Sequence, residues 1–273
     1  MSKDSTRIAL LIDSDNVSSE QIGHVLAELA RYGTASVRRM YGDWTSDQLK
    51  GWKAAANEYS IQPIQQFAYT TGKNATDSAL IIDAMDLLHQ NSLDAFAIVS
   101  SDSDFTRLAS RLRESGARVF GFGERKTPSP FVNACDAFTY LDALTVNDSS
   151  EPEPKPDPVK KPAQTPAPTS TNTATPKRFT STQLRGDTRL MNLLRAGISA
   201  SSDDDGWANL GAVGSTIRKQ SPDFDSRNWG YAKLGDLVTA IDYFQVKRGK
   251  TGGTTTFSVK IKTVGKQPAA KKK

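Results

Sequence analysis

The stretch IALLIDSDN, residues 8–16, joins an uninterrupted apolar run to two aspartates and an asparagine. A short run rich in Ile and Leu, ended by polar residues, is typical of a strand that is buried on both faces of a sheet. Asp13, Asp15 and Asn16 follow at the point where that strand ends. The stretch therefore predicts a central strand whose carboxyl end carries acidic side chains.

Outward from this strand, apolar runs alternate with amphipathic stretches of helical period. Strands are predicted at residues 8–12, 36–41, 61–68, 95–100 and 118–122, with 137–141 as a candidate sixth. Helices are predicted at residues 19–32, 46–59, 76–89 and 105–115. This alternation indicates an α/β domain with a doubly wound, mostly parallel sheet.

A proline-rich segment divides the chain. Residues 151–176 hold eight of the 13 prolines and no aromatic residue, so they cannot bury enough apolar surface to offset the entropy of ordering them. The predicted parts are an N-terminal domain at 1–147, a flexible linker at 148–178, a C-terminal domain at 179–262 and a basic tail at 263–273. We expect the linker to tether the second domain without a fixed interface to the first.

The net charge of +5 is unevenly distributed. Residues 1–147 carry 14 Lys and Arg against 18 Asp and Glu, a net charge of −4, whereas residues 148–273 carry 21 against 12, a net charge of +9. A basic C-terminal half suits a polyanionic partner, and an acidic N-terminal half suits a cation site. The alternative for the basic half is a solubilising tail.

Several classes of protein are excluded. Cys135 is the only cysteine, so one chain can form neither a disulfide nor a cysteine-based zinc site. No signal pattern opens the chain and no apolar run approaches about 18 residues, so we expect a cytoplasmic protein without a membrane partner. No glycine-rich phosphate motif follows a predicted strand, which disfavours dinucleotide and P-loop binding.

Carboxylates are expected to gather at one edge of the predicted sheet, because ligands bind beyond the carboxyl ends of parallel strands. Asp13, Asp102 and Asp104 follow two predicted strands, and Asp77 lies at the start of a predicted helix. Clustered carboxylates repel one another unless a divalent cation neutralises them, and hard oxygen ligands favour Mg²⁺ or Mn²⁺. The pattern predicts a metal site suited to phosphodiester hydrolysis.

Helix capping is the alternative role for each aspartate, since a carboxylate near a helix start accepts amide hydrogen bonds. Asp77 and Asp104 are most open to this interpretation, and Asp13 is least open to it. Convergence of three acidic segments on one edge weighs against capping for all of them. Asp83 is a candidate supporting carboxylate, and Asp86 is expected on a solvated helix face.

Three motifs of the N-terminal domain resemble the NYN family of PIN-like nucleases. They are IDSDN at 12–16, GKNATDSALIID at 72–83 and VSSDSDF at 99–105, in the order found in the family. The resemblance covers roughly residues 6–145 and implies a PIN-like Rossmannoid sheet with metal-dependent RNA cleavage. The residues that it implies as metal-binding and catalytic are Asp13, Asp77, Asp102 and Asp104.

The resemblance also implies two substrate-binding residues, Asn16 as the polar neighbour of Asp13 and Lys73 as a cation close to the scissile phosphate. A surface lysine without a role is the alternative for Lys73. As a hypothesis, the aspartates hold one or two Mg²⁺ ions, and no side chain has to act as a general base. The competing functions are a non-catalytic RNA-binding adaptor and a phosphohydrolase of small molecules, and the basic C-terminal half argues against the latter.

The C-terminal domain has the pattern of a small winged helix. A helix is predicted at residues 183–200, then helix, turn, helix and strand at 204–248, and FSVKIK at 257–262 closes a β-wing. From the residues alone, the module carries a basic surface interleaved with Trp229 and Tyr231, of which Trp229 is better placed in the core. The residues predicted to contact RNA phosphates are Arg218, Lys219, Arg227, Lys233, Lys247 and Arg248.

The same module resembles the LOTUS domain, also called OST-HTH. The resemblance rests on GWANLGAVGSTIRK at 206–219, SPDFDSRNWGYAKLGDLV at 221–238 and DYFQVKR at 242–248, and it covers roughly residues 185–262. It implies RNA binding or, in some members, docking to a protein partner, and LOTUS domains are known to be joined to NYN domains. We therefore predict a metal-dependent ribonuclease with an RNA-capturing module.

Overall fold

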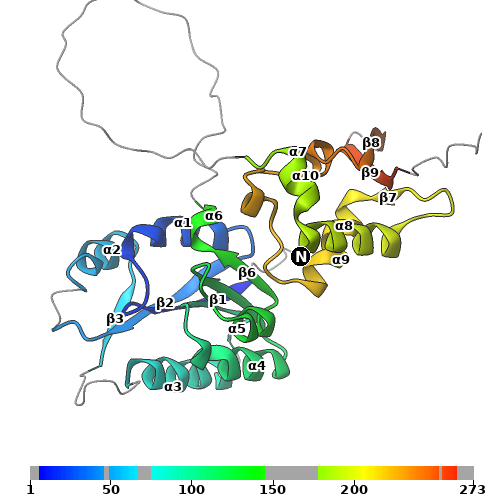
Figure 1. The fold of residues 1–273 in the computed structure, drawn as a ribbon. Coiled ribbons are helices and arrows are strands. Elements are labelled where there is room, and N and C mark those ends of the chain that lie inside the picture. Colours follow the sequence, from blue (N-terminus) through cyan, green and yellow to red (C-terminus); the bar gives the residue numbers. More distant parts are fainter. Residues whose placement is uncertain are drawn as a thin grey trace, which may run out of the picture.

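The structure is a computed structural model that describes residues 6–45, 49–66, 75–90, 92–144, 178–251 and 254–262. These residues form two domains that lie side by side (Figure 1). Lys73, the predicted tail, and the predicted linker up to residue 177 lie outside the described residues. Within the described part of the chain, no helix is long and apolar enough to cross a membrane.

The N-terminal domain is built on a six-stranded sheet, in which every pairing is parallel. The strands are β1 (Arg7–Asp13), β2 (Thr34–Gly42), β3 (Gln62–Gln65), β4 (Ala95–Val99), β5 (Arg118–Gly123) and β6 (Ala137–Tyr140). Their spatial order, β3-β2-β1-β4-β5-β6, reverses direction between β1 and β4. This switch point confirms the predicted doubly wound topology.

Helices cover both faces of this sheet (Figure 1). One face is covered by α1 (Ile22–Leu29), α2 (Trp52–Glu58) and α6 (Leu141–Leu144), and the other by α3 (Ala75–His89), α4 (Thr106–Glu114) and α5 (Ser129–Ala134). Strand β1 alternates between the two cores, with Ile8, Leu10 and Ile12 on one side and Ala9 and Leu11 on the other. Burial on both faces explains why the strand is apolar throughout.

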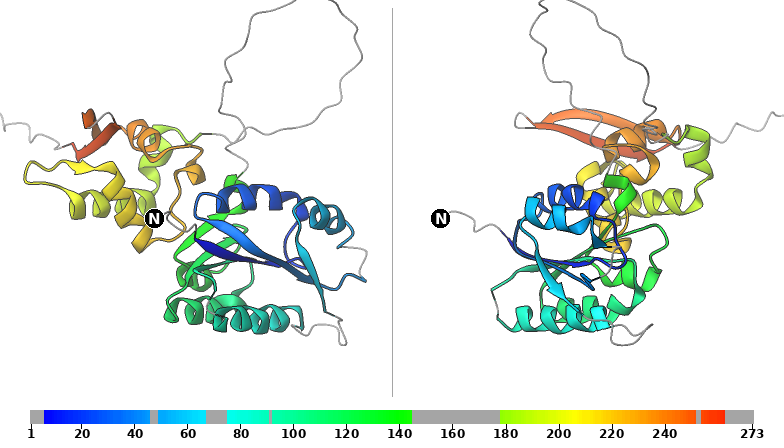
Figure 2. Two further views of the ribbon diagram at one scale, coloured as in Figure 1. Left: turned by 180° about the vertical axis from the view of Figure 1, so that it is seen from behind. Right: turned by 90° about the vertical axis from the view of Figure 1, so that its left-hand side faces the viewer.

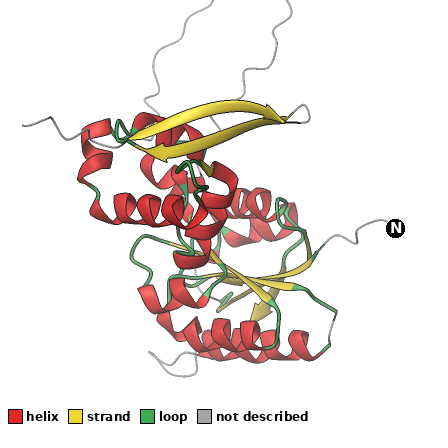
Figure 3. Ribbon diagram, turned by 90° about the vertical axis from the view of Figure 1, so that its right-hand side faces the viewer, coloured by secondary structure: helices red, strands yellow, loops and turns green. Residues whose placement is uncertain are grey.

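The C-terminal domain combines helices with a β-hairpin (Figure 3). Its elements are α7 (Ser181–Gly186), α8 (Thr188–Ser201), β7 (Ala208–Asn209), α9 (Leu210–Gln220), η5 (Ser226–Trp229), α10 (Leu234–Ala240), β8 (Phe244–Thr251) and β9 (Thr254–Ile261). The β8–β9 hairpin is the predicted wing, and β7 adds an antiparallel edge to it. The single helix predicted at 183–200 is two helices, because the Asp187 carboxylate accepts from the Leu190 N–H at 2.9 Å and begins α8 anew.

Tyr231, which we expected within the basic surface, belongs to the core of this domain, and Trp229 packs against that core, the placement favoured for it in the sequence. The Trp229 ring lies 5.7 Å from the Phe224 ring, and its Nε1 donates to Asp187 at 2.9 Å. Tyr231 is 8% exposed, and its hydroxyl donates to the Phe179 carbonyl at 2.7 Å. Both polar groups are satisfied inside the protein, and Tyr231 is buried, so its ring is not placed to stack on a base.

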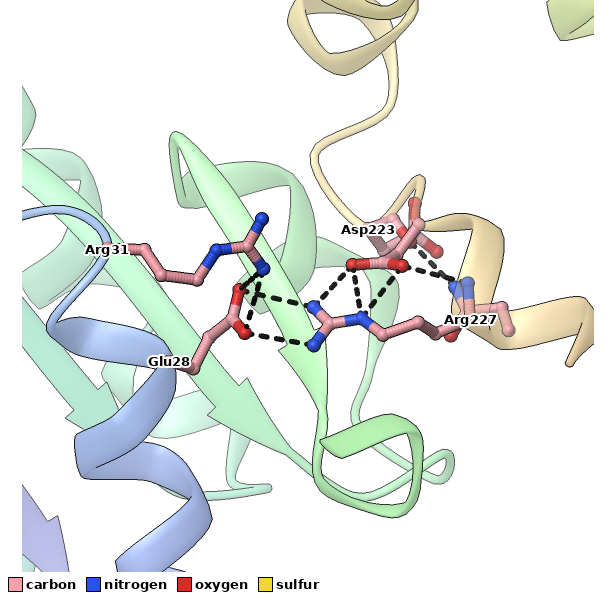
Figure 4. A network of polar contacts seen from close by, with 6 residues as sticks. Glu28, Arg31, Asp223 and Arg227 are labelled. Carbon is pink, nitrogen blue, oxygen red and sulfur yellow. Dashed lines mark hydrogen bonds and ion pairs between the residues drawn. The ribbon is translucent and has the colours of Figure 1, made fainter. Parts of the chain in front are cut away.

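The domains are docked through a buried ion pair (Figure 4). The Arg227 guanidinium donates to both oxygens of Glu28 in α1, at 2.9 and 3.1 Å, and also pairs with Asp225. The Arg227 and Glu28 side chains are 3% and 4% exposed. This contact corrects two expectations. The domains share a fixed interface, and Arg227 is enclosed by carboxylates, which removes it from the surface that could contact RNA.

Strand β6 supplies the second part of the interface. Its Phe138 N–H donates to the Pro222 carbonyl at 2.9 Å, and the Tyr140 hydroxyl donates to Asp223 at 3.1 Å. Arg189 of α8 donates to the same carboxylate at 2.7 Å. An edge strand exposes unpaired backbone groups, and the C-terminal domain satisfies one of these groups on β6.

We expect Asp223 and Asp225 to stabilise the folded C-terminal domain at neutral pH and to lose this contribution only in acid. Burial by itself raises the pKa of Asp223 and Asp225, but hydrogen bonds from Ser221 and Arg189 to Asp223, and from Arg227 to Asp225, outweigh it and leave both pKa values below 3.8. A lowered folded-state pKa contributes stability that is present above the unfolded-state pKa and is lost as pH falls through the folded value. In urea unfolding, the contribution of these carboxylates to the stability of the C-terminal domain should stay constant from about pH 8 to about pH 4 and fall below that. A loss of this domain's stability that begins above about pH 5 would contradict this expectation.

Candidate functional site

Three aspartates meet at the carboxyl end of the N-terminal sheet. Asp77 lies in the first turn of α3. Asp102 lies just before the short helix η3 (Ser103–Phe105) that follows β4, and Asp104 lies within it. One carboxylate oxygen from each lies within 4.8 Å of the other two. Parallel strands and the helices after them deliver side chains to this edge, so residues far apart in sequence form one acidic group.

Asp13, the last residue of β1, is 1% exposed. Its Oδ2 accepts hydrogen bonds from Asn16 Nδ2 at 2.8 Å and from Ser100 Oγ at 2.7 Å. Its Oδ1 is buried and has no hydrogen-bond partner among the described residues. A buried carboxylate oxygen without a donor is unfavourable unless a cation or another donor reaches it. Asp13 therefore presents one carboxylate oxygen that is available to a cation or to another donor.

Negative charge is concentrated at this edge. Burial, followed by the charges of Asp13, Asp102 and Asp104, raises the pKa of Asp77 to about 6. Burial also raises the pKa of Asp13, despite the two hydrogen bonds to its carboxylate. Carboxylates that destabilise one another's ionised form are the setting in which a divalent cation is favourable. The donor set, all of it carboxylate oxygen, suits a hard divalent cation.

The alternative role of helix capping applies to Asp102. This residue is the N-cap of η3, with its Oδ1 accepting the Asp104 N–H at 2.9 Å. In the sequence, Asp77 and Asp104 were the aspartates most open to this role. The difference arises because the chain turns into η3 directly after Asp102, which leaves the Asp102 carboxylate over the first free N–H groups.

Two contacts that sequence reasoning missed help to position the acidic group. Ser100, the first residue after β4, bonds Asp13 across 87 positions of sequence and accepts the Asp102 N–H at 3.1 Å. Asp15 accepts from Thr76 at 2.9 Å and so joins the loop after β1 to the start of α3. The only available signal was that polar residues directly follow a buried strand.

The remaining acidic residues of α3 lie apart from the group. Asp83 accepts hydrogen bonds from Arg39 and from the Tyr41 hydroxyl, both on β2. It is therefore committed to holding α3 against the sheet and does not support the aspartates as we expected. Asp86 is exposed, in line with the predicted solvated face.

The predicted substrate-binding residues other than Arg227, which is buried, and Lys73, which lies outside the described residues, are exposed. Asn16 is exposed beside Asp13, and Arg248 lies with its guanidinium 5.3 Å from the centre of the Phe257 ring. The exposed basic residues of the C-terminal domain include Arg218, Lys219, Lys233, Lys247 and Arg248.

Comparisons with known proteins agree with this architecture. Residues 7–142 match the family model of the NYN domain, and residues 185–256 match that of the OST-HTH/LOTUS domain. No curated protein matches the chain.

Two solved structures are similar to parts of the chain. A crystal structure of a Vibrio parahaemolyticus protein of unknown function is 17% identical, with a TM-score of 0.45, and covers 53% of this chain and 98% of its own. A solution NMR structure from Chromobacterium violaceum is 32% identical, with a TM-score of 0.25, and covers 30% of this chain and 88% of its own.

Proposed function

Because this chain belongs to the NYN-domain proteins and also carries an OST-HTH/LOTUS domain, we propose that it is a metal-dependent ribonuclease that cleaves RNA phosphodiester bonds. The two domains together indicate an RNA-related, nuclease-type function. The observation that carries the finer proposal is the acidic group itself, in which three carboxylates converge beside a buried Asp13 oxygen that has no partner among the described residues.

Asp13, Asp77, Asp102 and Asp104 would hold one or two Mg²⁺ or Mn²⁺ ions. When bound, such a cation polarises a phosphoryl oxygen and lowers the pKa of a water for in-line attack. Asn16 and Ser100 fix the Asp13 carboxylate by donating to Oδ2, so that Oδ1 stays available.

The basic residues supply binding in this proposal. Lys73, which precedes α3, would neutralise a substrate phosphate as a point charge. The exposed cations of the C-terminal domain would hold RNA through its backbone, with an affinity that falls as salt rises because bound counterions are released. Arg227 has no part in this binding, since Glu28 and Asp225 already neutralise it.

We expect the purified full chain to degrade mixed RNA with Mn²⁺ or Mg²⁺, and a chelator to abolish the degradation. Asp13→Ala should be inactive, because it removes a buried ligand. The matched control is Asp86→Ala, which removes an exposed aspartate of α3 and should retain full activity. The readout is the loss of intact RNA on a denaturing gel.

The other results of this assay separate the competing functions. RNA bound tightly but never cleaved, with either metal, would indicate a non-catalytic adaptor. Hydrolysis of a small phosphate ester without RNA cleavage would indicate a phosphohydrolase. Cleavage that persists in chelator, or in Asp13→Ala, would overturn the proposed metal site.

A further inference from the structure

Two hollows lie where the domains meet. One, of about 760 Å³, is lined by Arg31 of the N-terminal domain and by Arg218 and Lys233 of the C-terminal domain. The other, of about 630 Å³, is lined by Arg118 of β5 together with Arg218 and Lys219 at the end of α9. Arg218 lines both, so the hollows are neighbours. Together they form a surface, here called the groove, with walls from both domains.

The carboxylates in this groove are already neutralised. Asp225 pairs with Arg227 at 2.6 Å, and Asp136 pairs with Arg113 at 3.1 Å. By contrast, several exposed cations that line the groove have no ion-pair partner among the residues that the structure describes. These cations are Arg118, Arg218, Lys219 and Lys233. The groove therefore carries an excess of positive charge that no side chain in the described part of the chain offsets.

We propose that this composite groove, defined by Arg31, Arg118, Arg218, Lys219 and Lys233, is where the protein holds the phosphate backbone of a single RNA strand. The inference rests on the proposed function in taking RNA as the ligand. It adds that the N-terminal domain supplies half of the RNA-binding surface. Cations spread along two neighbouring hollows suit a polyanion with regularly spaced charges. Docking through Arg227 and Glu28 is what brings the two walls together.

The composite groove lies at the opposite end of the sheet from the acidic group. Arg118 is the first residue of β5 and Arg31 follows the end of α1, whereas Asp13 is the last residue of β1. In Figure 2 the C-terminal domain accordingly lies toward the start of β1, away from the end of that strand. At about 3.3 Å per residue, the strands separate the two sites by on the order of 20 Å. An RNA strand held in the groove must therefore run along the N-terminal domain before it reaches the aspartates.

The test is RNA binding by the full chain, measured by fluorescence anisotropy with a labelled single-stranded RNA and chelator present, so that cleavage does not interfere. Arg118→Glu and Lys219→Glu should each weaken binding about tenfold, because each places a carboxylate in the groove. The matched control is Lys53→Glu, at an exposed lysine of α2, and it should change binding less than about twofold. Helix α2 lies on the side of the N-terminal domain away from the C-terminal domain (Figure 1). Equal effects of all three variants would overturn the composite groove.

Glu28→Lys separates the groove from general electrostatic attraction. It adds two units of positive charge, so attraction alone would tighten RNA binding. The substitution also places the lysine ammonium next to the Arg227 guanidinium, and repulsion between them should separate the domains. Separation divides the groove, so we expect RNA binding to weaken about tenfold. Unchanged or tighter binding by an undocked Glu28→Lys protein, with undocking established by X-ray scattering, would contradict the inference.

Failure of the groove and failure of the nuclease proposal give different results. Loss of binding in Arg118→Glu and Lys219→Glu, by a protein that never cleaves RNA, would support the groove and overturn the nuclease. Metal-dependent cleavage with binding unaffected by both variants would overturn the groove alone. Polyglutamate that displaces the RNA as effectively as unlabelled RNA would assign the groove to an acidic peptide instead.

Discussion

Asp13→Asn, Asp77→Asn and Asp102→Asn should each abolish RNA cleavage while the protein stays folded. Asparagine keeps the shape of aspartate but removes the negative charge that binds a divalent cation. Changes to groups that merely support metal ligands already cost 10- to 100-fold in known metal sites, so loss of a ligand should lower kcat/KM at least about 100-fold. Single-turnover cleavage at saturating Mn²⁺ measures the effect. Full activity in all three variants would contradict the proposed site.

The same substitution at Asp77 should stabilise the protein in the absence of metal. The pKa of Asp77 in the folded protein is about 6, which lies above the ordinary value of 3.8. At neutral pH the carboxylate is ionised and destabilises the fold. Once the pH falls below the ordinary value, the carboxylate is protonated in both the folded and the unfolded protein, and this effect disappears. Asp77→Asn should therefore raise the free energy of unfolding at pH 7 by up to about 3 kcal/mol, and barely change it near pH 4.

Urea unfolding of the full chain in chelator tests this effect. Asp86→Asn, on the exposed face of the same helix, should leave the free energy of unfolding unchanged at both pH values. If Asp77→Asn destabilises the protein at pH 7, the carboxylate serves α3 mainly as a helix-terminal acceptor, which was the alternative that we considered for this residue.

Arg227→Met should separate the two domains. Removing one partner of a buried ion pair leaves the other charge uncompensated, at a cost of about 3 to 5 kcal/mol. Arg31 also pairs with Glu28, at 3.0 Å, so the effect should fall at the lower end of that range. Because each domain has its own hydrophobic core, the loss should appear as undocking rather than unfolding.

X-ray scattering and thermal melting distinguish these outcomes. The radius of gyration should rise, and one melting transition should become two. The double variant Arg227→Met, Glu28→Leu should restore docking, because a well-packed apolar pair can replace a buried ion pair without loss of stability. Arg248→Met, at an exposed arginine, is the control and should leave both measurements unchanged. An unchanged radius of gyration in Arg227→Met would show that β6 alone holds the domains together.

Local patterns were sufficient to predict most of the N-terminal fold. A strand buried on both faces has to be apolar throughout, so IALLI at residues 8–12 identified β1, and alternation with helices identified the parallel sheet. The short helices α5 and α6 escaped prediction because four to six residues do not show a helical period. The acidic group could be anticipated because strand direction alone brings the residues after β1 and β4 to one edge.

The sequence by itself thus determined the sheet, the winged module and the edge at which the aspartates gather, since each follows from the order of apolar and polar residues along the chain. Only the tertiary structure decided how those parts meet. Arg227 and Glu28 are 199 positions apart. The sequence around an arginine does not show whether its side chain contacts RNA or a buried carboxylate. The same holds for Ser100, which reaches Asp13 only across the sheet. The partner of a charged or polar side chain depends on distances that folding creates, and these distances placed Arg227 in the interface and left Asp13 Oδ1 without a partner among the described residues.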